Sequence, residues 1–64
     1  MFYNMNIHKK IKEFVSKNEV VTSSEVAKEF KISWNTADKY LLELVVEGNA
    51  RKIKKPGVNL WMAK

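Results

Sequence analysis

The apolar residues of this 64-residue chain change their spacing at Gly48. Before Gly48 they recur at the three- and four-residue spacing of a helix face, and after it they form two short β-prone runs. When the hairpin folds back on the helices, the apolar residues of both parts can share one core. We therefore expect a single domain over residues 1–64. The predicted fold class is α+β: mainly α, with three helices and a small β-hairpin.

Capping residues mark the predicted ends of the helices. Asn4 or Asn6 suits the start of the first helix, and Thr22–Glu25 has the pattern of a capping box for the second. Ser33 is suited to cap the third helix, and Gly48 to end it. The expected elements are helices at 6–17, 23–30 and 33–47, a short strand at 19–22 and a hairpin at 50–63.

The two runs after Gly48 are separated by Lys55-Pro56-Gly57. Proline followed by glycine suits a type II turn, whereas two-residue hairpin loops prefer the mirror-image turns, so we expect a loop of about four or five residues. The alternation of a strand places Asn59 and Trp61 on one face and Val58, Leu60 and Met62 on the other.

Several classes of function are disfavoured by what the sequence lacks. It contains no cysteine, which excludes disulfides, a thiolate nucleophile and a zinc knuckle and fits a cytoplasmic protein. Its single histidine, His8, has no neighbouring cluster of metal ligands. Neither a nucleophile–base pair, a glycine-rich phosphate loop nor a membrane-spanning apolar run is present. We therefore expect no enzymatic activity, no metal, no cofactor and no membrane contact.

Positive charge is concentrated at the C-terminal end of the chain. The formal net charge is +5, and residues 49–64 hold five basic residues and no acidic one. Four of the five surround the predicted turn: Arg51, Lys52, Lys54 and Lys55. A basic cluster of this kind is either a solvated surface or the contact for an anionic partner, and its position around a turn favours the partner.

Two segments resemble the winged helix-turn-helix superfamily. Residues 22–30 are similar to the first helix of its motif, with Ala27 as the small residue at the helix contact, and residues 33–41 are similar to the start of its recognition helix. Lys31 stands where the motif turn often has glycine, so this turn must accept a side chain. The resemblance implies a small transcriptional regulator of prokaryotic or archaeal type. Helix 33–47 would enter the major groove of double-stranded DNA, and hairpin 50–63 would be the wing on the phosphate backbone.

The resemblance assigns candidate DNA contacts to the recognition helix and the wing. Asn35 could pair with adenine, and Lys39 could reach guanine or a phosphate. Asp38 either accepts a hydrogen bond from a cytosine amine or pairs with a lysine on the surface. Trp34 either lies against the nucleic acid or, as is commoner, covers the edge of the core, and Trp61 favours packing. The predicted DNA-binding residues are Ser33, Trp34, Asn35, Thr36, Asp38, Lys39, Arg51, Lys52, Lys54 and Lys55.

Leu42 and Val46 form an apolar pair on the otherwise polar outer face of helix 33–47. They are expected either to join two copies into a homodimer or to pack under an N-terminal arm carrying Phe2 and Tyr3. Double-stranded DNA is the predicted partner of the domain. An RNA- or ribosome-associated winged helix and a protein-interaction module are the alternatives.

Overall fold

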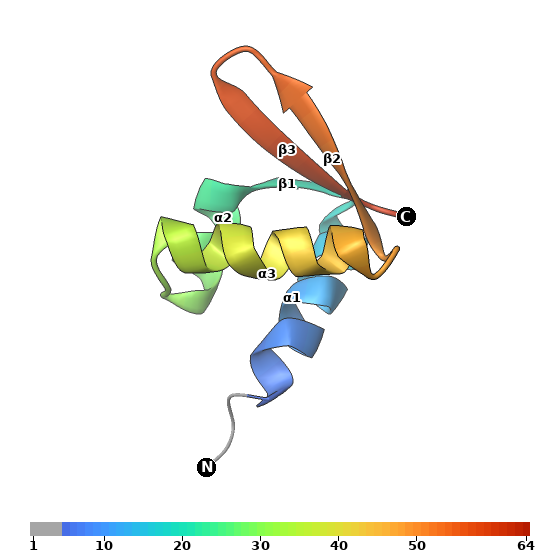
Figure 1. Ribbon diagram of the computed structural model, residues 1–64. Coiled ribbons are helices and arrows are strands. Elements are labelled where there is room, and N and C mark those ends of the chain that lie inside the picture. The colour runs from blue at the N-terminus through green and yellow to red at the C-terminus, as the bar shows by residue number, and fades with distance from the viewer. Residues whose placement is uncertain (1–4) are drawn as a thin grey trace.

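The computed structural model describes residues 5–64, with side chains from Ile7 onward. It confirms the α+β class, with three helices and a small antiparallel sheet (Figure 1). The predicted caps at Asn4 or Asn6, and the arm carrying Phe2 and Tyr3, lie outside what it describes. The elements in chain order are α1 (Met5–Asn18), β1 (Val20–Thr22), α2 (Ser23–Phe30), α3 (Trp34–Val46), β2 (Ala50–Lys55) and β3 (Val58–Ala63).

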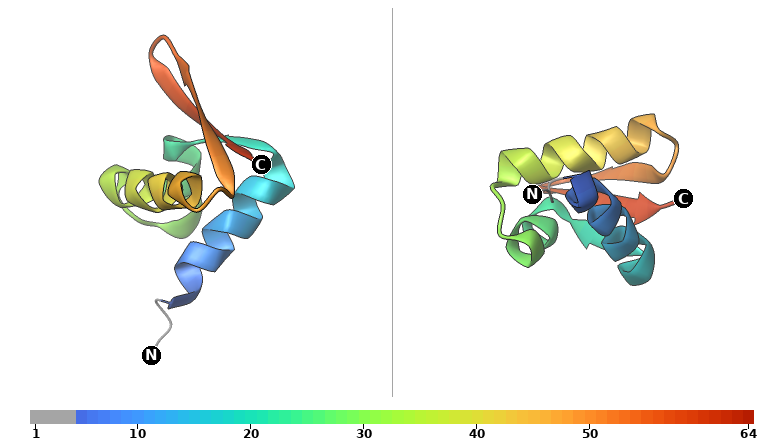
Figure 2. Two further views of the ribbon diagram at one scale, coloured as in Figure 1. Left: turned by 45° about the vertical axis from the view of Figure 1, so that its right-hand side comes forward. Right: turned by 90° about the horizontal axis from the view of Figure 1, so that it is seen from below.

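The sheet has the strand order β1-β3-β2, so the last strand lies between the other two. Val21, Trp61 and Lys52 lie side by side across the three strands, on the same face of the sheet. The tip of the β2–β3 hairpin extends well past the helices, as the views in Figures 1 and 2 agree. The base of the hairpin therefore belongs to the core, and its tip is free to meet a partner.

Residues from every helix and every strand meet in one small core around Trp61, which is 1% exposed. On the helices, the buried positions follow the predicted apolar spacing, with Ala37, Leu41 and Leu44 as the inward stripe of α3. A T-shaped contact between Phe14 and Phe30, with ring centroids 5.7 Å apart, closes the core between α1 and α2. The buried apolar residues are Ile11, Val15, Val21, Val26, Ala37, Leu41, Leu44, Ala50 and Trp61.

The predicted caps of α2 and α3 are confirmed. Thr22 Oγ1 accepts the Glu25 N–H at 3.1 Å, and Glu25 Oε1 accepts the Thr22 N–H at 2.8 Å, which completes the capping box. Ser33 caps α3 through its side-chain oxygen. Gly48, with a φ of 84°, provides the left-handed residue that ends this helix, and its N–H donates to the Val45 carbonyl at 3.0 Å.

The predicted hairpin loop of about four or five residues is wrong. Lys55 pairs with Val58, so the loop contains only Pro56 and Gly57. Proline holds its own φ negative, and Gly57 supplies a φ of 80°, so two residues suffice for the reversal. Such a turn splays the strands that it joins, and a tip that extends past the helices tolerates that splay.

The turn between α2 and α3 does accept a side chain, as its sequence requires. Lys31 adopts the left-handed conformation, with φ 55° and ψ 47°, and its N–H donates to the Ala27 carbonyl. Glu19 between α1 and β1 also has a positive φ, of 68°, which the sequence pattern did not predict. In the described part of the chain, no helix has the length and apolar character needed to cross a membrane.

Replacing Lys31 by glycine is expected to raise the free energy of unfolding by about 0.5–1 kcal/mol. The left-handed conformation costs an L-residue about 1–2 kcal/mol, and the larger entropy of unfolded glycine offsets part of that gain. The matched control is Lys28→Gly, the same change at a right-handed position of α2, which is expected to destabilise the protein by about 1 kcal/mol. Urea denaturation measures both. If the two variants were equally destabilised, Lys31 would carry no strain.

Candidate nucleic-acid interface

The N-terminal half of α3 presents three of the predicted contact residues to solvent. Asn35 and Lys39 are exposed one helical turn apart on the outer face. Trp34 is 64% exposed, so the expectation that it covers the edge of the core is wrong. The physical reason is its position: Trp34 is the first residue of α3, one turn before Ala37, at which the buried stripe of this helix begins.

Ser33 and Thr36 are coupled to each other at the start of α3. Ser33 Oγ accepts the Thr36 N–H at 3.2 Å, and the Ser33 hydroxyl donates to Thr36 Oγ1 at 2.9 Å. Both side chains therefore have a structural role at the cap. Their predicted contacts with phosphate stay predictions.

Asp38 belongs to a polar chain that joins α3 to the sheet. The indole N–H of Trp61 donates to Ser23 Oγ at 2.9 Å, and the Ser23 hydroxyl donates in turn to Asp38 Oδ1. Sequence reasoning missed this link, although a buried tryptophan usually needs an acceptor for its N–H. The chain ties the start of α2, the middle of α3 and the central strand together, and it fixes how the hairpin stands relative to α3.

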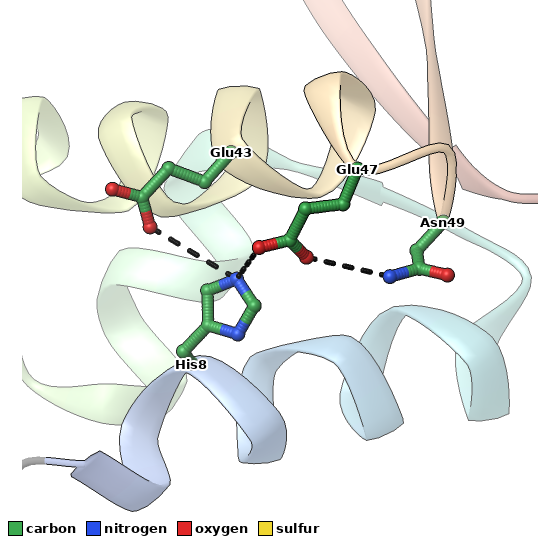
Figure 3. A network of polar contacts seen from close by, with 4 residues as sticks. All are labelled: His8, Glu43, Glu47 and Asn49. Carbon is green, nitrogen blue, oxygen red and sulfur yellow. Dashed lines mark hydrogen bonds and ion pairs between the residues drawn. The ribbon is translucent and has the colours of Figure 1, made fainter.

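The other two acidic residues, Glu43 on α3 and Glu47 at its C-cap, face α1. His8 Nε2 lies 3.2 Å from Glu47 Oε2 and 3.9 Å from Glu43 Oε1 (Figure 3). Glu47 also accepts a hydrogen bond from the side-chain amide of Asn49 at 3.3 Å. Both carboxylates lie toward the C-terminal end of the helix. Asn35 lies in the first turn, away from both, whereas Lys39 borders one surface hollow together with Glu43 and Glu47.

The four basic residues of the hairpin are all exposed, but they do not form one patch. Strand alternation places Lys52 and Lys54 on the face that carries Trp61, and Arg51 on the opposite face. The Lys52 ammonium lies 5.3 Å from the centroid of the Trp61 ring and shields it from solvent as a cation–π contact. Lys54 and Lys55 are farther along the hairpin, close to its tip.

Lys54 and Lys55 share a groove with the start of α3, which we call the α3–hairpin groove. It has a volume of about 550 Å³. The residues that line it include Ser23, Trp34, Asp38, Lys54, Lys55 and Asn59. The fold thus brings together residues of the two predicted DNA-contact segments.

Leu42 and Val46 lie outside this groove, on the C-terminal half of α3. The two residues are 46% and 86% exposed. They therefore form an apolar surface on the described part of the protein, as the sequence indicates. Self-association through this pair stays a prediction.

A search against protein-family models finds no match to this sequence, and a search of curated proteins finds no significant similarity. Among the described residues, no group of three or more histidine, aspartate or glutamate side chains is arranged to hold a metal ion. The resemblance to winged helix-turn-helix proteins therefore stays a prediction from the sequence motifs. The function must be argued from the groove and the charges around it.

Replacing Ser23 by alanine is expected to lower the free energy of unfolding by about 1–3 kcal/mol, because the buried Trp61 N–H loses its acceptor. The matched control is Ser24→Ala, the same change at the next residue, which is exposed and should alter stability by about 0.5 kcal/mol or less. Urea denaturation followed by tryptophan fluorescence measures both variants. Equal stabilities for the two would show that the Trp61–Ser23 bond does not hold the hairpin in place.

Proposed function

We propose that this protein binds double-stranded DNA through the N-terminal half of α3 and the β2–β3 hairpin, and that it acts as a small transcriptional regulator. One observation carries the proposal: Lys54 and Lys55 of the hairpin lie across a single groove from Trp34 at the start of α3. An exposed helix end beside a basic hairpin suits a duplex, whose grooves and phosphate backbones alternate along its surface.

The dimensions of α3 support its role in the major groove. Its 13 residues give a length of about 20 Å, and a helix of ordinary diameter fits a major groove of about 12 Å width. Asn35 in the first turn and Lys39 in the second are the side chains placed to reach base edges. Asparagine pairs well with adenine, and lysine with guanine or a phosphate.

The positions of the acidic residues limit where a phosphate can approach α3. A carboxylate facing a phosphate would weaken binding, and α3 with its C-cap carries three: Asp38, Glu43 and Glu47. Glu43 and Glu47 lie against His8, on the flank that faces α1. Asp38 accepts the Ser23 hydroxyl. Glu43 and Glu47 nevertheless border one surface hollow with Lys39, and Asp38 lines the α3–hairpin groove, so we expect phosphates to be held by Lys54 and Lys55 instead of along α3.

Replacing Lys54 and Lys55 together by alanine is expected to weaken binding to every duplex alike. The slope of log affinity against log salt should fall by about 0.9 for each phosphate that the hairpin no longer neutralises. The matched control is the double variant Lys9→Ala and Lys10→Ala, which removes the same charge from exposed positions of α1. Fluorescence anisotropy over a series of salt concentrations gives both affinities and slopes. The hairpin would not be the phosphate anchor if the two double variants behaved identically.

Replacing Asn35 by alanine is expected to reduce binding to a preferred duplex more than binding to a scrambled one. A good base contact discriminates by about 1–3 kcal/mol, whereas a phosphate contact carries no sequence information. The preferred site is first selected from random duplexes, and Asn35→Ala and Lys39→Ala are then measured on both sequences. Thr36→Ser, which keeps the hydroxyl bonded to Ser33, is the control in the same helix turn. An unchanged affinity ratio in both alanine variants would show that α3 does not read the sequence in this way.

A further inference from the structure

Trp34 is the largest side chain that the described part of the protein leaves mostly in solvent. It is 64% exposed, whereas the other tryptophan, Trp61, is 1% exposed. Burial of a large apolar side chain stabilises a folded domain, and a domain of this size gains little of that stability from Trp34. Trp34 is the first residue of α3, directly after the Ser33 cap, and it lines the α3–hairpin groove.

The groove has the chemistry of a nucleotide site. Its volume of about 550 Å³ lies within the range of small-molecule sites, about 300–1,000 Å³. One wall includes Trp34, whose indole can stack on a flat base, and the other includes Lys54 and Lys55, whose flexible side chains can bring positive charge to a phosphate. Asp38 and Asn59 also line the groove, and their oxygens can accept hydrogen bonds from the amino groups of bases.

The charges also determine the orientation of the ligand. Asp38 lies on the α3 side of the groove and repels a phosphate there, while Lys54 and Lys55 attract one on the hairpin side. The Ser23 hydroxyl holds one carboxylate oxygen of Asp38, which fixes the direction of the group. A nucleotide therefore fits with its base toward Trp34 and its phosphate toward the two lysines.

We propose that the α3–hairpin groove binds an unpaired nucleotide, its base stacked on Trp34 and its phosphate held by Lys54 and Lys55. The base must be unpaired, because both faces of a base within a duplex are covered by its neighbours and only its edges are accessible. This inference rests on the nucleic-acid binding proposed above and extends it to single-stranded overhangs and flipped bases.

Affinity for a blunt duplex and for the same duplex with a short single-stranded overhang tests this inference. Stacking of one base on an aromatic ring predicts that the overhang duplex binds roughly 5- to 100-fold more tightly. Trp34→Ala should bring the ratio of the two affinities close to one, and Trp34→Tyr should keep most of it. Val20→Ala is the control, since Val20 is an exposed apolar residue outside the groove, and it should keep the wild-type ratio.

Intrinsic fluorescence gives an independent readout. Trp34 and Trp61 are the only tryptophans in the chain, and Trp61 is buried, so stacking of a base should quench the emission of Trp34. Adenosine monophosphate is titrated beside the single-stranded oligonucleotide. Quenching by both shows that the groove takes a nucleotide from either source, and quenching by the oligonucleotide alone shows that it requires a strand. Thermal melts confirm that the Trp34 variants fold.

Three outcomes would overturn the inference. Equal wild-type affinity for blunt and overhang duplexes would refute it and leave duplex binding intact. An equal reduction of affinity for both duplexes in Trp34→Ala would place Trp34 against the duplex itself instead of an unpaired base. Absence of binding to any nucleic acid would remove the proposed function together with this inference.

Discussion

The burial of Trp61 is the interaction on which the rest of the structure depends. Its ring fills the centre of the core, and its N–H must be satisfied there, because an unpaired buried donor costs about 1–3 kcal/mol. Ser23 supplies the acceptor, at 2.9 Å. Since Trp61 lies on the central strand and Ser23 at the start of α2, this one bond joins the sheet to the helices. The Ser23 hydroxyl in turn donates to Asp38, which links α3 to α2 and to the sheet.

The hairpin gains its position from this anchor. A two-stranded ribbon is marginally stable by itself in water, and the outer part of this one carries Lys54 and Lys55, which repel each other. Its base is secured by Trp61, by the Lys52 ammonium over the indole ring, and by the half-buried cross-strand pair of Ile53 and Leu60. The basic tip contributes little to the core, but these contacts at the base of the hairpin hold it at a defined place beside α3. Charge in a fixed position can recognise a phosphate in a way that charge on a loose tail cannot.

The sequence predicts the elements of this fold well because their signals are local. The apolar spacing, the Thr22–Glu25 capping box and Gly48 each act within a few residues, and the helix ends agree with the predictions to within one residue. Contacts between distant segments were harder to foresee. The pairing of Asp38 with Ser23 depends on residues 15 positions apart, and the exposure of Trp34 depends on where the core ends. The hairpin loop was predicted to be too long, because two-residue hairpin loops generally prefer mirror-image turns. Pro56 and Gly57 nevertheless reverse the chain by themselves.

The exposed apolar groups of α3 fall toward its two ends, and this division bears on function. Trp34 lies at the first residue beside the hairpin, whereas Val46, which is 86% exposed, lies at the last. The 13 residues of the helix separate the two positions by about 18 Å, too far for one small ligand to cover both. Glu43, Glu47 and Lys39 border one hollow with Val46, whereas Lys54 and Lys55 line the groove with Trp34. The anionic partner proposed above is therefore expected at the Trp34 end, where lysines outnumber carboxylates in the groove. Self-association through Leu42 and Val46, which stays a prediction, would therefore use a surface separate from the α3–hairpin groove.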